Sequence, residues 1–309
     1  MRIWRLDDAG TLVAAEMARP VAGDGELLLR VRAAGVTPTE LKWYPTTHTK
    51  AGGKRLGAVP GHEFSGVVEA VAEGANTGWK AGDEVFGMND WFADGATAEF
   101  CVTRPEWVAR KPGRSSHAEA ATVPIGALTA WQGLMVRANV QRGERVLVHG
   151  GSGGVGVFAV QLARHAGARV VTTASRRNLE FLRALGVEEV IDYRSGAFEE
   201  KAGQVDVVFD TVGGETLARS WGVLKPGGRM VTIAADVEGT AEERLKRAFF
   251  IVEPNGEQLA EIGKLLESGE IRAVVDCAVG MDEAGEAYAG RARGRVGRGK
   301  VAVRMDVVD

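Results

Sequence analysis

The 309-residue chain has only two cysteines, Cys101 and Cys277, which lie far apart and have no CxxC partner. Two isolated cysteines exclude a disulfide framework and a thiolate cage for a metal, and they are typical of a reducing cytoplasm. Apolar runs of ~18 residues, the length of a membrane span, are also missing, and the first residues, MRIWRLDDAG, carry two acids where a signal peptide needs an apolar stretch. We therefore expect a cytoplasmic protein without a membrane partner.

The chain also lacks a strong charge of either sign. Its formal net charge is -3, with 26% charged and 45% hydrophobic residues. This balance gives no reason to expect nucleic acid or an anionic membrane as a partner, and it favours a globular protein that acts on small molecules. At this length, two domains are a better expectation than one.

Short β-type runs cut by glycine and proline fill the first 120 residues, at 27–33, 63–71, 84–86 and 98–102. They predict an antiparallel, barrel-like domain. Helical spacing follows at 117–123 and 128–137, and strands then alternate with helices. The predicted strands are 145–149, 169–173, 189–192, 206–210, 229–233 and 249–252, and the predicted helices between them are 155–166, 178–185, 214–223 and 241–247. Six strands alternating with helices predict a parallel, doubly wound α/β sheet of the Rossmann type.

A further helix at 256–267 precedes two more β-type runs, 274–279 and 300–303, so we expect the tail to complete the first domain. The predicted domains are 1–122 with 268–309, and 123–267. The Arg/Gly stretch 291–300 is expected to be a loop before the last strand and not a nucleic-acid arm.

A glycine-rich turn joins the strand 145–149 to the helix that follows it, with the pattern Gly-x-Gly-x-x-Gly at Gly151, Gly153 and Gly156. Between a strand and a helix, this pattern predicts a site for the pyrophosphate of a dinucleotide, because glycine allows the sharp turn and the close approach of the phosphate. The N-terminus of the helix then receives the negative charge. The alternative is a purely structural turn. The predicted cofactor-binding residues of the turn are Gly151, Ser152, Gly153, Gly154, Val155 and Gly156.

The residues that follow the next predicted strand, 169–173, predict whether the cofactor is NAD or NADP. NAD-binding proteins place Asp or Glu there to hold the ribose 2′-hydroxyl, whereas this chain has Ser175, Arg176 and Arg177. A hydroxyl and two guanidiniums bind a 2′-phosphate through charge-assisted hydrogen bonds, so the segment predicts NADPH. The alternative is that both arginines are solvated residues of a helix's first turn, although cations are unfavourable at that end of a helix.

With these motifs, the chain resembles the medium-chain dehydrogenase/reductase superfamily, and most closely its zinc-free NADPH:quinone oxidoreductase branch. The resemblance extends over nearly the whole length. It depends on AAGVTPTE at 33–40, PGHEFSG at 60–66, AGDEV at 81–85, LTAW at 128–131, the run 151–161, LG at 185–186, IDY at 191–193, D-x-VG at 210–213 and RGKV at 298–301.

The resemblance implies a GroES-like catalytic domain beside the nucleotide domain, an active site in the cleft and a homodimer. It implies that Tyr193 joins the 2′-phosphate group, although by itself Tyr193 looks like a strand-end core residue. Further cofactor contacts that it implies are Thr129, Val212, Phe249, Phe250, Ile251, Arg298 and Lys300.

Zinc-dependent members of the superfamily hold the metal with a cysteine, a histidine of a Gly-His-Glu motif and a third ligand. His62 and Glu63 match that motif, but Thr37 stands at the cysteine position, and no cysteine-rich lobe follows residue 90. A threonine hydroxyl cannot supply a thiolate, so we expect no metal. His62 is then expected to be a hydrogen-bonded loop or cleft residue, with Glu63 as a structural partner. His48, His117, His149 and His165 have no ligand spacing.

Without a metal to polarise an alcohol or ketone, the predicted reaction is hydride transfer from NADPH to a quinone or to the activated C=C of an enone or enal. The resemblance places Thr37, Trp43, Tyr44, His48 and His62 at the substrate pocket, with Tyr44 and Thr37 as candidate catalytic residues. Trp43 and Tyr44 are alternatively packing residues of the loop. Two other functions stay open: a zinc-dependent alcohol dehydrogenase, and a crystallin-like NADPH-binding protein or sensor without turnover.

Overall fold

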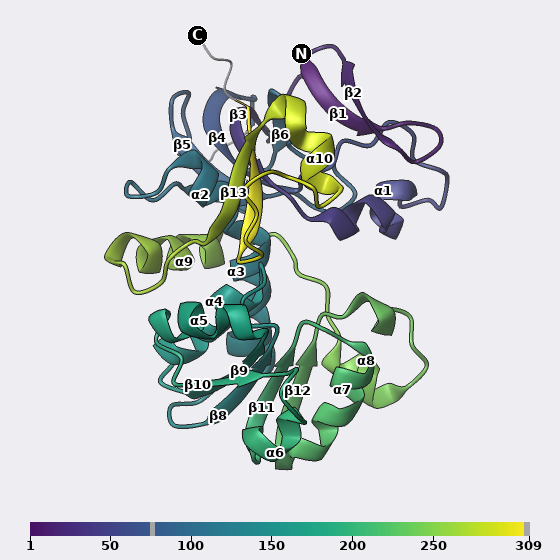
Figure 1. Cartoon of the computed structure of the whole chain (residues 1–309). Coiled ribbons are helices and arrows are strands. Elements are labelled where there is room, and N and C mark those ends of the chain that lie inside the picture. The colour runs from purple at the N-terminus through teal and green to yellow at the C-terminus, as the bar shows by residue number, and fades with distance from the viewer. Residues whose placement is uncertain (75–77, 306–309) are drawn as a thin grey trace. The chain divides into compact units, whose positions relative to one another are not determined.

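The computed structural model describes residues 1–74 and 78–305, and the chain divides into two compact units (Figure 1). Unit 1 comprises Met1–Ile125, Glu253–Gly269 and Ala273–Asp309, and unit 2 comprises Gly126–Val252 and Glu270–Arg272. The units differ from the predicted domain bounds mainly at residues 253–267, which lie in unit 1. The predicted bounds stay a prediction.

Unit 1 is built on a mostly antiparallel sheet. Its order is β13-β14-β3-β4-β5-β7, with β6 paired to β3, and a separate hairpin is formed by β1 and β2. The tail completes this sheet as expected, because β14 pairs antiparallel with β3, with Ala302 opposite Gly35. The strands are β1 (Arg2–Leu6), β2 (Leu12–Glu16), β3 (Leu27–Gly35), β4 (Glu63–Val71), β5 (Glu84–Met88), β6 (Phe100–Thr103), β7 (Val108–Arg110), β13 (Val275–Gly280) and β14 (Lys300–Arg304).

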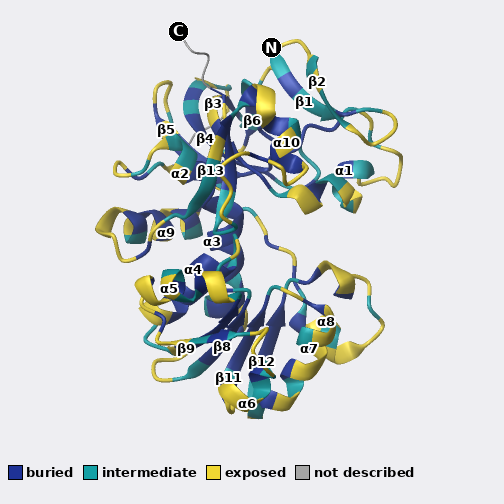
Figure 2. Ribbon diagram, viewed as in Figure 1, coloured by how far each residue is buried: buried dark blue, intermediate teal, exposed yellow. Residues whose placement is uncertain are grey.

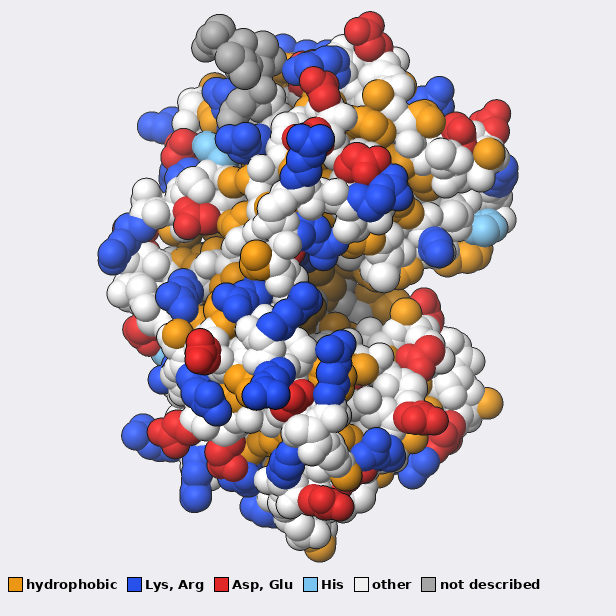
Figure 3. Space-filling view, in the orientation of Figure 1, with side chains coloured by type: hydrophobic (Ala, Val, Ile, Leu, Met, Phe, Trp, Pro, Cys, Tyr) orange, Lys and Arg blue, Asp and Glu red, His pale blue; other side chains and the backbone are white. Residues whose placement is uncertain are grey.

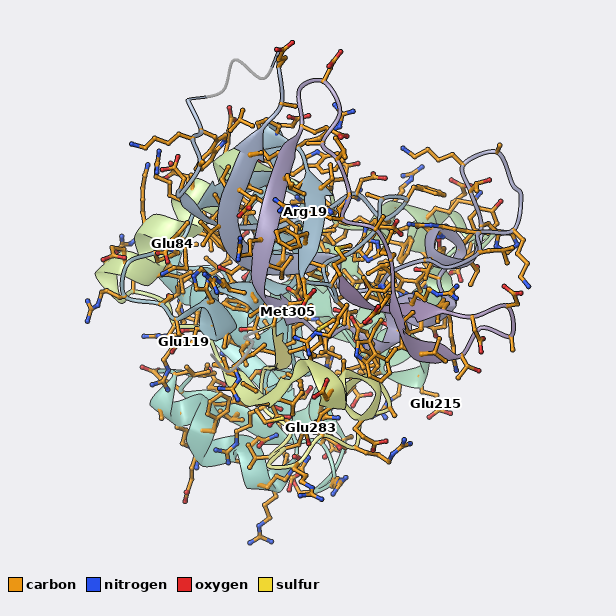
Figure 4. All side chains as sticks on the ribbon, turned by 90° about the horizontal axis from the view of Figure 1, so that it is seen from above. Arg19, Glu84, Glu119, Glu215, Glu283 and Met305 are labelled. Carbon is orange, nitrogen blue, oxygen red and sulfur yellow. The ribbon has the colours of Figure 1, made fainter. Side chains whose placement is uncertain are left out.

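The sheet of unit 1 is largely buried, and polar side chains lie at its rim. Leu27, Leu29 and Phe64 are fully buried in its core, and Leu28, between Leu27 and Leu29, is also buried, so burial in β3 is not confined to one face. At the surface, the guanidinium of Arg19, labelled in Figure 4, lies 4.1 Å from the centre of the Phe100 ring and also pairs with Glu69. Long charged side chains thus shield apolar parts of the sheet from water.

Four α-helices lie in the described part of unit 1, and one of them, α9, covers most of the segment 253–267, where unit 1 and the predicted bounds differ. A Cβ on Gly256, the first residue of α9, would lie 2.5 Å from the carbonyl oxygen of Val108 in β7. The absence of a side chain therefore lets α9 pack closely against unit 1. The helices are α1 (Tyr44–Thr47), α2 (His117–Ala121), α9 (Gly256–Ser268) and α10 (Ala284–Tyr288).

Unit 2 holds the predicted parallel sheet. In the described residues it has five strands, in the order β10-β9-β8-β11-β12. The sixth predicted strand, at 249–252, is reduced to one parallel bridge between Phe249 and Thr232, after which the chain leaves the sheet. The strands are β8 (Arg145–His149), β9 (Arg169–Ala174), β10 (Glu189–Asp192), β11 (Val205–Asp210) and β12 (Leu224–Thr232).

Figure 2 shows the central strands of unit 2 buried, while the helices around them expose one side. This is the pattern of a doubly wound sheet with both faces covered. The predicted helix 128–137 changes to a π-helix at Gln132–Arg137, where a Cβ on Gly133 would lie 2.2 Å from the Phe209 ring. The α-helices are α3 (Pro124–Trp131), whose first two residues belong to unit 1, α4 (Gly156–His165), α5 (Leu179–Ala184), α6 (Phe198–Ala202), α7 (Gly214–Ser220) and α8 (Glu243–Ala248).

None of the helices in the described residues is both long and apolar enough to cross a membrane.

Candidate functional site

The strand order of unit 2 fixes where a ligand is expected. From β8 the chain goes outward through β9 to β10, and then returns to the other side of β8 with β11 and β12. Such a reversal leaves a crevice at the carboxyl ends of the two strands where the order changes, because their connections run to opposite faces. The glycine turn follows β8 directly and therefore lies at this switch point.

The three glycines of the motif differ in whether the fold itself requires glycine. A Cβ on Gly151 would lie 2.1 Å from the Thr172 hydroxyl, and one on Gly156 would lie 2.1 Å from the carbonyl oxygen of Gly150, so both are required by packing. A Cβ on Gly153 would meet only that same carbonyl, at an ordinary 3.4 Å, and Gly153 is exposed. The fold alone does not demand glycine at position 153. A dinucleotide phosphate that approaches this backbone does, and the turn therefore fits such a group.

The predicted 2′-phosphate residues lie at the carboxyl end of β9. Ser175 precedes a single 3₁₀ turn, Arg176–Asn178, in which Arg176 and Arg177 are exposed. Tyr193, which follows β10, is 51% exposed, and its backbone N–H donates to the Ala174 carbonyl at 3.3 Å. The backbone of Tyr193 thus lies beside the end of β9, directly before the arginine segment, while its contact with a 2′-phosphate stays a prediction. Figure 3 shows Lys and Arg side chains gathered on the part of the surface that carries α5 and β10.

Val212 and the segment 249–251 lie at the ends of β11 and β12. A Cβ on Gly150 would be 3.4 Å from Val212 Cγ2, so Val212 borders the glycine turn. Asp210 accepts hydrogen bonds from the Thr232 hydroxyl and from the backbone N–H of Gly213, and these bonds hold the turn after β11. Burial raises the pKa of Asp210. Phe250 donates its N–H to the Thr232 carbonyl and is buried. Predicted cofactor residues therefore follow the carboxyl ends of β8, β9, β10 and β11, and the segment 249–251 pairs with the end of β12.

Helix α3 also reaches the turn. A Cβ on Gly126 would lie 2.4 Å from the carbonyl oxygen of Gly154, so the helix backbone approaches the phosphate turn closely. Thr129, one helical turn further along α3, is 3% exposed. Helix α3 thus lies beside the candidate cofactor site, while a contact between Thr129 and the nicotinamide stays a prediction.

In unit 1, Lys300 brings together two residues that the sequence singled out. Its ammonium donates to the Thr37 hydroxyl at 3.0 Å and forms an ion pair with Glu63. Glu63 is fully buried and also accepts the Ile125 N–H at 3.0 Å. Burial raises the pKa of Glu63, and the adjacent ammonium opposes that rise. Lys300, predicted to contact the cofactor, is thus positioned with its ammonium against Thr37 and Glu63.

His62 is hydrogen-bonded through both ring nitrogens. Nδ1 lies 2.5 Å from the carboxylate of Glu40, and Nε2 lies 3.2 Å from the Ala93 carbonyl oxygen. Glu40, which is fully buried, also accepts the Tyr288 hydroxyl at 3.0 Å and the Gly61 N–H. Burial raises the pKa of Tyr288 well above its usual value, and the Glu40 charge adds to this effect.

An aromatic group lies against His62. The rings of Trp43 and Trp91 meet edge to face with 4.6 Å between their centres, and Trp91 lies 5.1 Å from the imidazole of His62. Tyr44 stacks on His48 at 4.5 Å and is 52% exposed. Trp43 and His62 are therefore joined through Trp91, whereas Tyr44 and His48 form a separate stacked pair.

The donor set at Thr37 and His62 does not fit a catalytic zinc ion. Zinc in dehydrogenases prefers thiolate, imidazole and carboxylate ligands, but Thr37 offers a hydroxyl that is bonded to a cation. The Nε2 atom of His62, which a metal would need, is directed to the Ala93 carbonyl. Residues 1–74 and 78–305 contain no group of three or more His, Cys, Asp or Glu side chains suited to a metal ion.

Several residues of these groups were missed by sequence reasoning. Glu40, Trp91 and Tyr288 arrange His62 in unit 1, and Asn178 and Thr173 bond to the glycine turn in unit 2. For Asn178, the sequence offered one indication of a role at the cofactor site, because this residue directly follows Arg176 and Arg177. Glu40 is the last residue of the AAGVTPTE motif, but that motif gave no indication of its bond to His62. Trp91, Tyr288 and Thr173 belong to no motif, because their roles arise from long-range contacts.

Comparisons with known proteins agree with this architecture. Residues 23–133 match the alcohol dehydrogenase GroES-like domain, and residues 185–303 match the zinc-binding dehydrogenase family. The chain is 34% identical over 289 residues to 2-methylene-furan-3-one reductase of Solanum lycopersicum, covering 89% of this chain and 71% of that protein. It is 32% identical over 288 residues to the chloroplastic NADPH-dependent alkenal/one oxidoreductase of Arabidopsis thaliana, covering 89% and 72%.

Among solved structures, the quinone oxidoreductase from Coxiella burnetii superposes with a TM-score of 0.88 at 30% identity, covering 99% of both chains. Its fold and the two domain matches confirm the predicted combination of a GroES-like domain with a parallel-sheet, Rossmann-like domain. The chain belongs to the medium-chain dehydrogenase/reductase superfamily, in its quinone oxidoreductase-like branch, and is an NAD(P)H-dependent oxidoreductase.

Proposed function

We propose that this protein is a zinc-free, NADPH-dependent reductase of quinones or of the activated C=C bond of enones and enals. The observation that carries the proposal is the hydrogen bond from Lys300 to Thr37. Thr37 stands where zinc-dependent members of the family have their first zinc ligand, and its hydroxyl is bonded to the Lys300 ammonium instead. The names of two relatives, a furanone reductase and an alkenal/one oxidoreductase, support this substrate class.

The choice of NADPH is supported by charge at the end of β9. Arg176 and Arg177 are exposed there, with Ser175 before them and Tyr193 beside them. Guanidinium groups bind phosphate through paired, charge-assisted hydrogen bonds, and no carboxylate stands at 175–177 to select a ribose 2′-hydroxyl. The relative from Arabidopsis thaliana is named NADPH-dependent.

When bound, NADPH supplies the hydride for such a reduction. The contribution of this chain follows from the Thr37 group. Because the Thr37 oxygen accepts from an ammonium, its own hydrogen is left to point elsewhere, and a hydroxyl polarised in this way is a good donor to a substrate carbonyl oxygen. Tyr44 is the second candidate donor, since its side chain is exposed. Trp43 and Trp91 offer apolar surface that excludes water.

In this proposal, an enone gains the hydride at its β-carbon and a proton, supplied by solvent or by Tyr44, at the α-carbon. Thr37 holds the carbonyl oxygen, on which negative charge develops as the hydride arrives. A quinone gains a hydride and a proton in the same way. No further acid–base pair is needed.

The test is an NADPH-oxidation screen over quinones, 2-alkenals and cyclic enones, with metal analysis of the same protein sample. Turnover of at least one class without stoichiometric zinc supports the proposal. Stoichiometric zinc, with activity lost to a chelator, supports the zinc-dependent alcohol dehydrogenase instead. Tight NADPH binding without turnover across the panel supports the sensor or crystallin-like alternative.

The predicted homodimer, the cytoplasmic location and the domain bounds 1–122 with 268–309 and 123–267 belong to the same proposal. Sedimentation of the purified chain tests the dimer, and limited proteolysis tests the bounds.

A further inference from the structure

A buried histidine stands directly before the glycine turn. His149, the last residue of β8, has no exposed surface. Its Nδ1 lies 3.0 Å from the hydroxyl of Thr173 in β9, and its Nε2 lies 2.8 Å from the hydroxyl of Ser220 in α7. Both ring nitrogens are thus engaged within unit 2, and His149 acts through its neighbours and not by touching a ligand.

The direction of each hydrogen bond follows from its partners. The Ser220 hydroxyl donates to the carbonyl of Thr216 at 2.6 Å, so its oxygen accepts from Nε2–H of His149. The other ring nitrogen, Nδ1, then carries a lone pair and accepts from the Thr173 hydroxyl. Burial lowers the pKa of His149 to about 4, so the neutral ring that this arrangement needs is the form present near neutral pH.

This chain of bonds ends on the phosphate turn. With its hydrogen given to His149, the Thr173 oxygen accepts the backbone N–H of Gly150 at 3.3 Å. The Gly151 N–H donates to the Thr173 carbonyl at 3.2 Å. Gly150 has a φ of +74°, a conformation that glycine adopts without strain, and the path of the following residues depends on it.

We propose that His149 is a positioning residue of the dinucleotide site. It holds the Thr173 hydroxyl in the one orientation that accepts the Gly150 N–H, and this sets the backbone of residues 150–156 to receive a pyrophosphate. The inference depends on the phosphate site of the proposed function, but not on the choice of NADPH over NADH and not on the substrate. The ligand chemistry concerned is the diphosphate that both dinucleotides share.

A merely structural role makes a different prediction. If His149 only fills the core, its replacement lowers the stability of unit 2 but leaves the affinity of the folded protein for a dinucleotide unchanged. If His149 positions the turn, the affinity for NADP⁺ and for NAD⁺ falls by the same factor. It falls equally when Thr173, the intermediary, is replaced.

The experiment titrates the full chain with NADP⁺ and with NAD⁺ by calorimetry, after circular dichroism has shown each variant to be folded. We expect His149→Phe and Thr173→Val to weaken both dinucleotides by about tenfold, the loss expected for a mispositioned charged contact. Ser220→Ala, at the far end of the chain of bonds, has a smaller effect in the same direction. His165→Gln, an exposed histidine of the same unit paired with Glu270, is the matched control and binds like the parent. Hydrogen exchange of a peptide spanning 147–156 supplies a second readout, and it is faster in His149→Phe and Thr173→Val than in the parent and in His165→Gln.

Gly153→Ala tests the phosphate site separately from His149, since its Cβ has room in the fold. In the proposed site, that Cβ would obstruct the approach of the phosphate. If Gly153→Ala binds both dinucleotides like the parent, the phosphate site of the proposed function is wrong, and this inference with it. If Gly153→Ala binds more weakly while folded His149→Phe and Thr173→Val do not, only the inference about His149 is overturned. Should His149→Phe fail to fold, Thr173→Val decides, because it removes one hydroxyl and preserves the shape.

Discussion

The side-chain amide of Asn178 donates a hydrogen bond to the hydroxyl of Ser152, with 2.8 Å between Nδ2 and Oγ. Ser152 belongs to the glycine turn, and Asn178 ends the 3₁₀ turn that carries Arg176 and Arg177. Asn178 is 2% exposed, and its backbone N–H donates to the Ser175 carbonyl. The segment proposed for the 2′-phosphate is therefore tied to the turn proposed for the pyrophosphate.

From this link we predict that Asn178→Ala reduces the preference for NADPH over NADH several-fold, chiefly by weakening NADPH. Without the link, the arginine segment must be ordered by the ligand itself, which costs affinity. Fluorescence titration of both cofactors measures the ratio. Ser152→Ala removes the other partner and has the same effect, so an unchanged ratio in both variants would contradict the link.

Replacing the two arginines addresses cofactor choice directly. We expect Arg176→Ala with Arg177→Ala to weaken NADPH by roughly tenfold to a hundredfold, because charge-assisted hydrogen bonds to the 2′-phosphate are lost, and to leave NADH nearly unchanged. Arg183→Ala, an exposed arginine of α5, is the matched control. The prediction fails if the double variant keeps the parent's preference or if the parent binds NADH as tightly as NADPH.

The glycine turn and its flanks could be predicted from sequence because their chemistry is local. A strand, a turn and a helix follow one another, and Gly151, Gly153 and Gly156 lie within six residues. The same holds for most strands of both sheets, whose hydrophobic patterns are strong, although the three-residue strand β7 was missed and the predicted strand 249–252 is only one bridge. The hairpin β1–β2, helix α6 and helix α10 were missed because they are short and because tertiary contacts support them, as when Trp4 of β1 donates to the Met281 carbonyl.

The side chains around the site depend on contacts that no short motif encodes. Lys300 is separated from Thr37 by 263 positions, and Tyr288 is separated from Glu40 by 248. The sequence identified Thr37, His62 and Lys300 through family motifs, and it predicted a cofactor contact for Lys300 but not the contacts with Thr37 and Glu63. Only the pairing of β14 with β3, which begins beside Gly35, shows why the ammonium reaches Thr37 and Glu63.

Thr37 offers a test of the proposed chemistry. We expect Thr37→Val to lower kcat on the order of a hundredfold, the loss typical of one donor to a developing oxyanion, while the affinity for NADPH stays the same. Thr37→Ser retains the hydroxyl and much of the activity. Steady-state kinetics with the best substrate of the screen provides the measurement. Equal activity of Thr37→Val and the parent would remove Thr37 from the mechanism.

Removing one charge of the Lys300–Glu63 pair is expected to lower the free energy of unfolding more than removing both charges. Lys300→Met alone leaves a buried carboxylate without its cation and lowers the free energy of unfolding by about 3–5 kcal/mol. Glu63→Gln combined with Lys300→Met removes both charges and restores part of that loss. Urea unfolding of the two variants and the parent measures the difference, and a double variant less stable than Lys300→Met would refute the prediction.

His149 also predicts how stability depends on pH. Its pKa is about 4 in the folded chain, where burial disfavours the charged ring, against 6.5 for an unperturbed histidine. Glu199 opposes this shift and Arg219 adds to it. Between these values the unfolded chain binds more protons than the folded chain, so His149 lowers stability as pH falls from about 6.5 to about 4, by on the order of 3 kcal/mol in total.

The comparison of the parent with His149→Gln isolates this contribution, because the other histidines are common to both proteins. The free energy of unfolding of the parent minus that of the variant is expected to be constant above pH 7 and to fall steadily from about pH 6.5 toward pH 4. Glutamine can still accept from Thr173 and donate to Ser220, so the variant retains polar partners for both hydroxyls. A difference that stays constant between pH 7.5 and pH 5 would mean that the ring is as freely hydrated in the folded chain as in the unfolded chain, and a difference that rises as pH falls would mean that the ring is protonated in the folded chain. The one-directional hydrogen bonding that ties Gly150 to Thr216 would then be wrong.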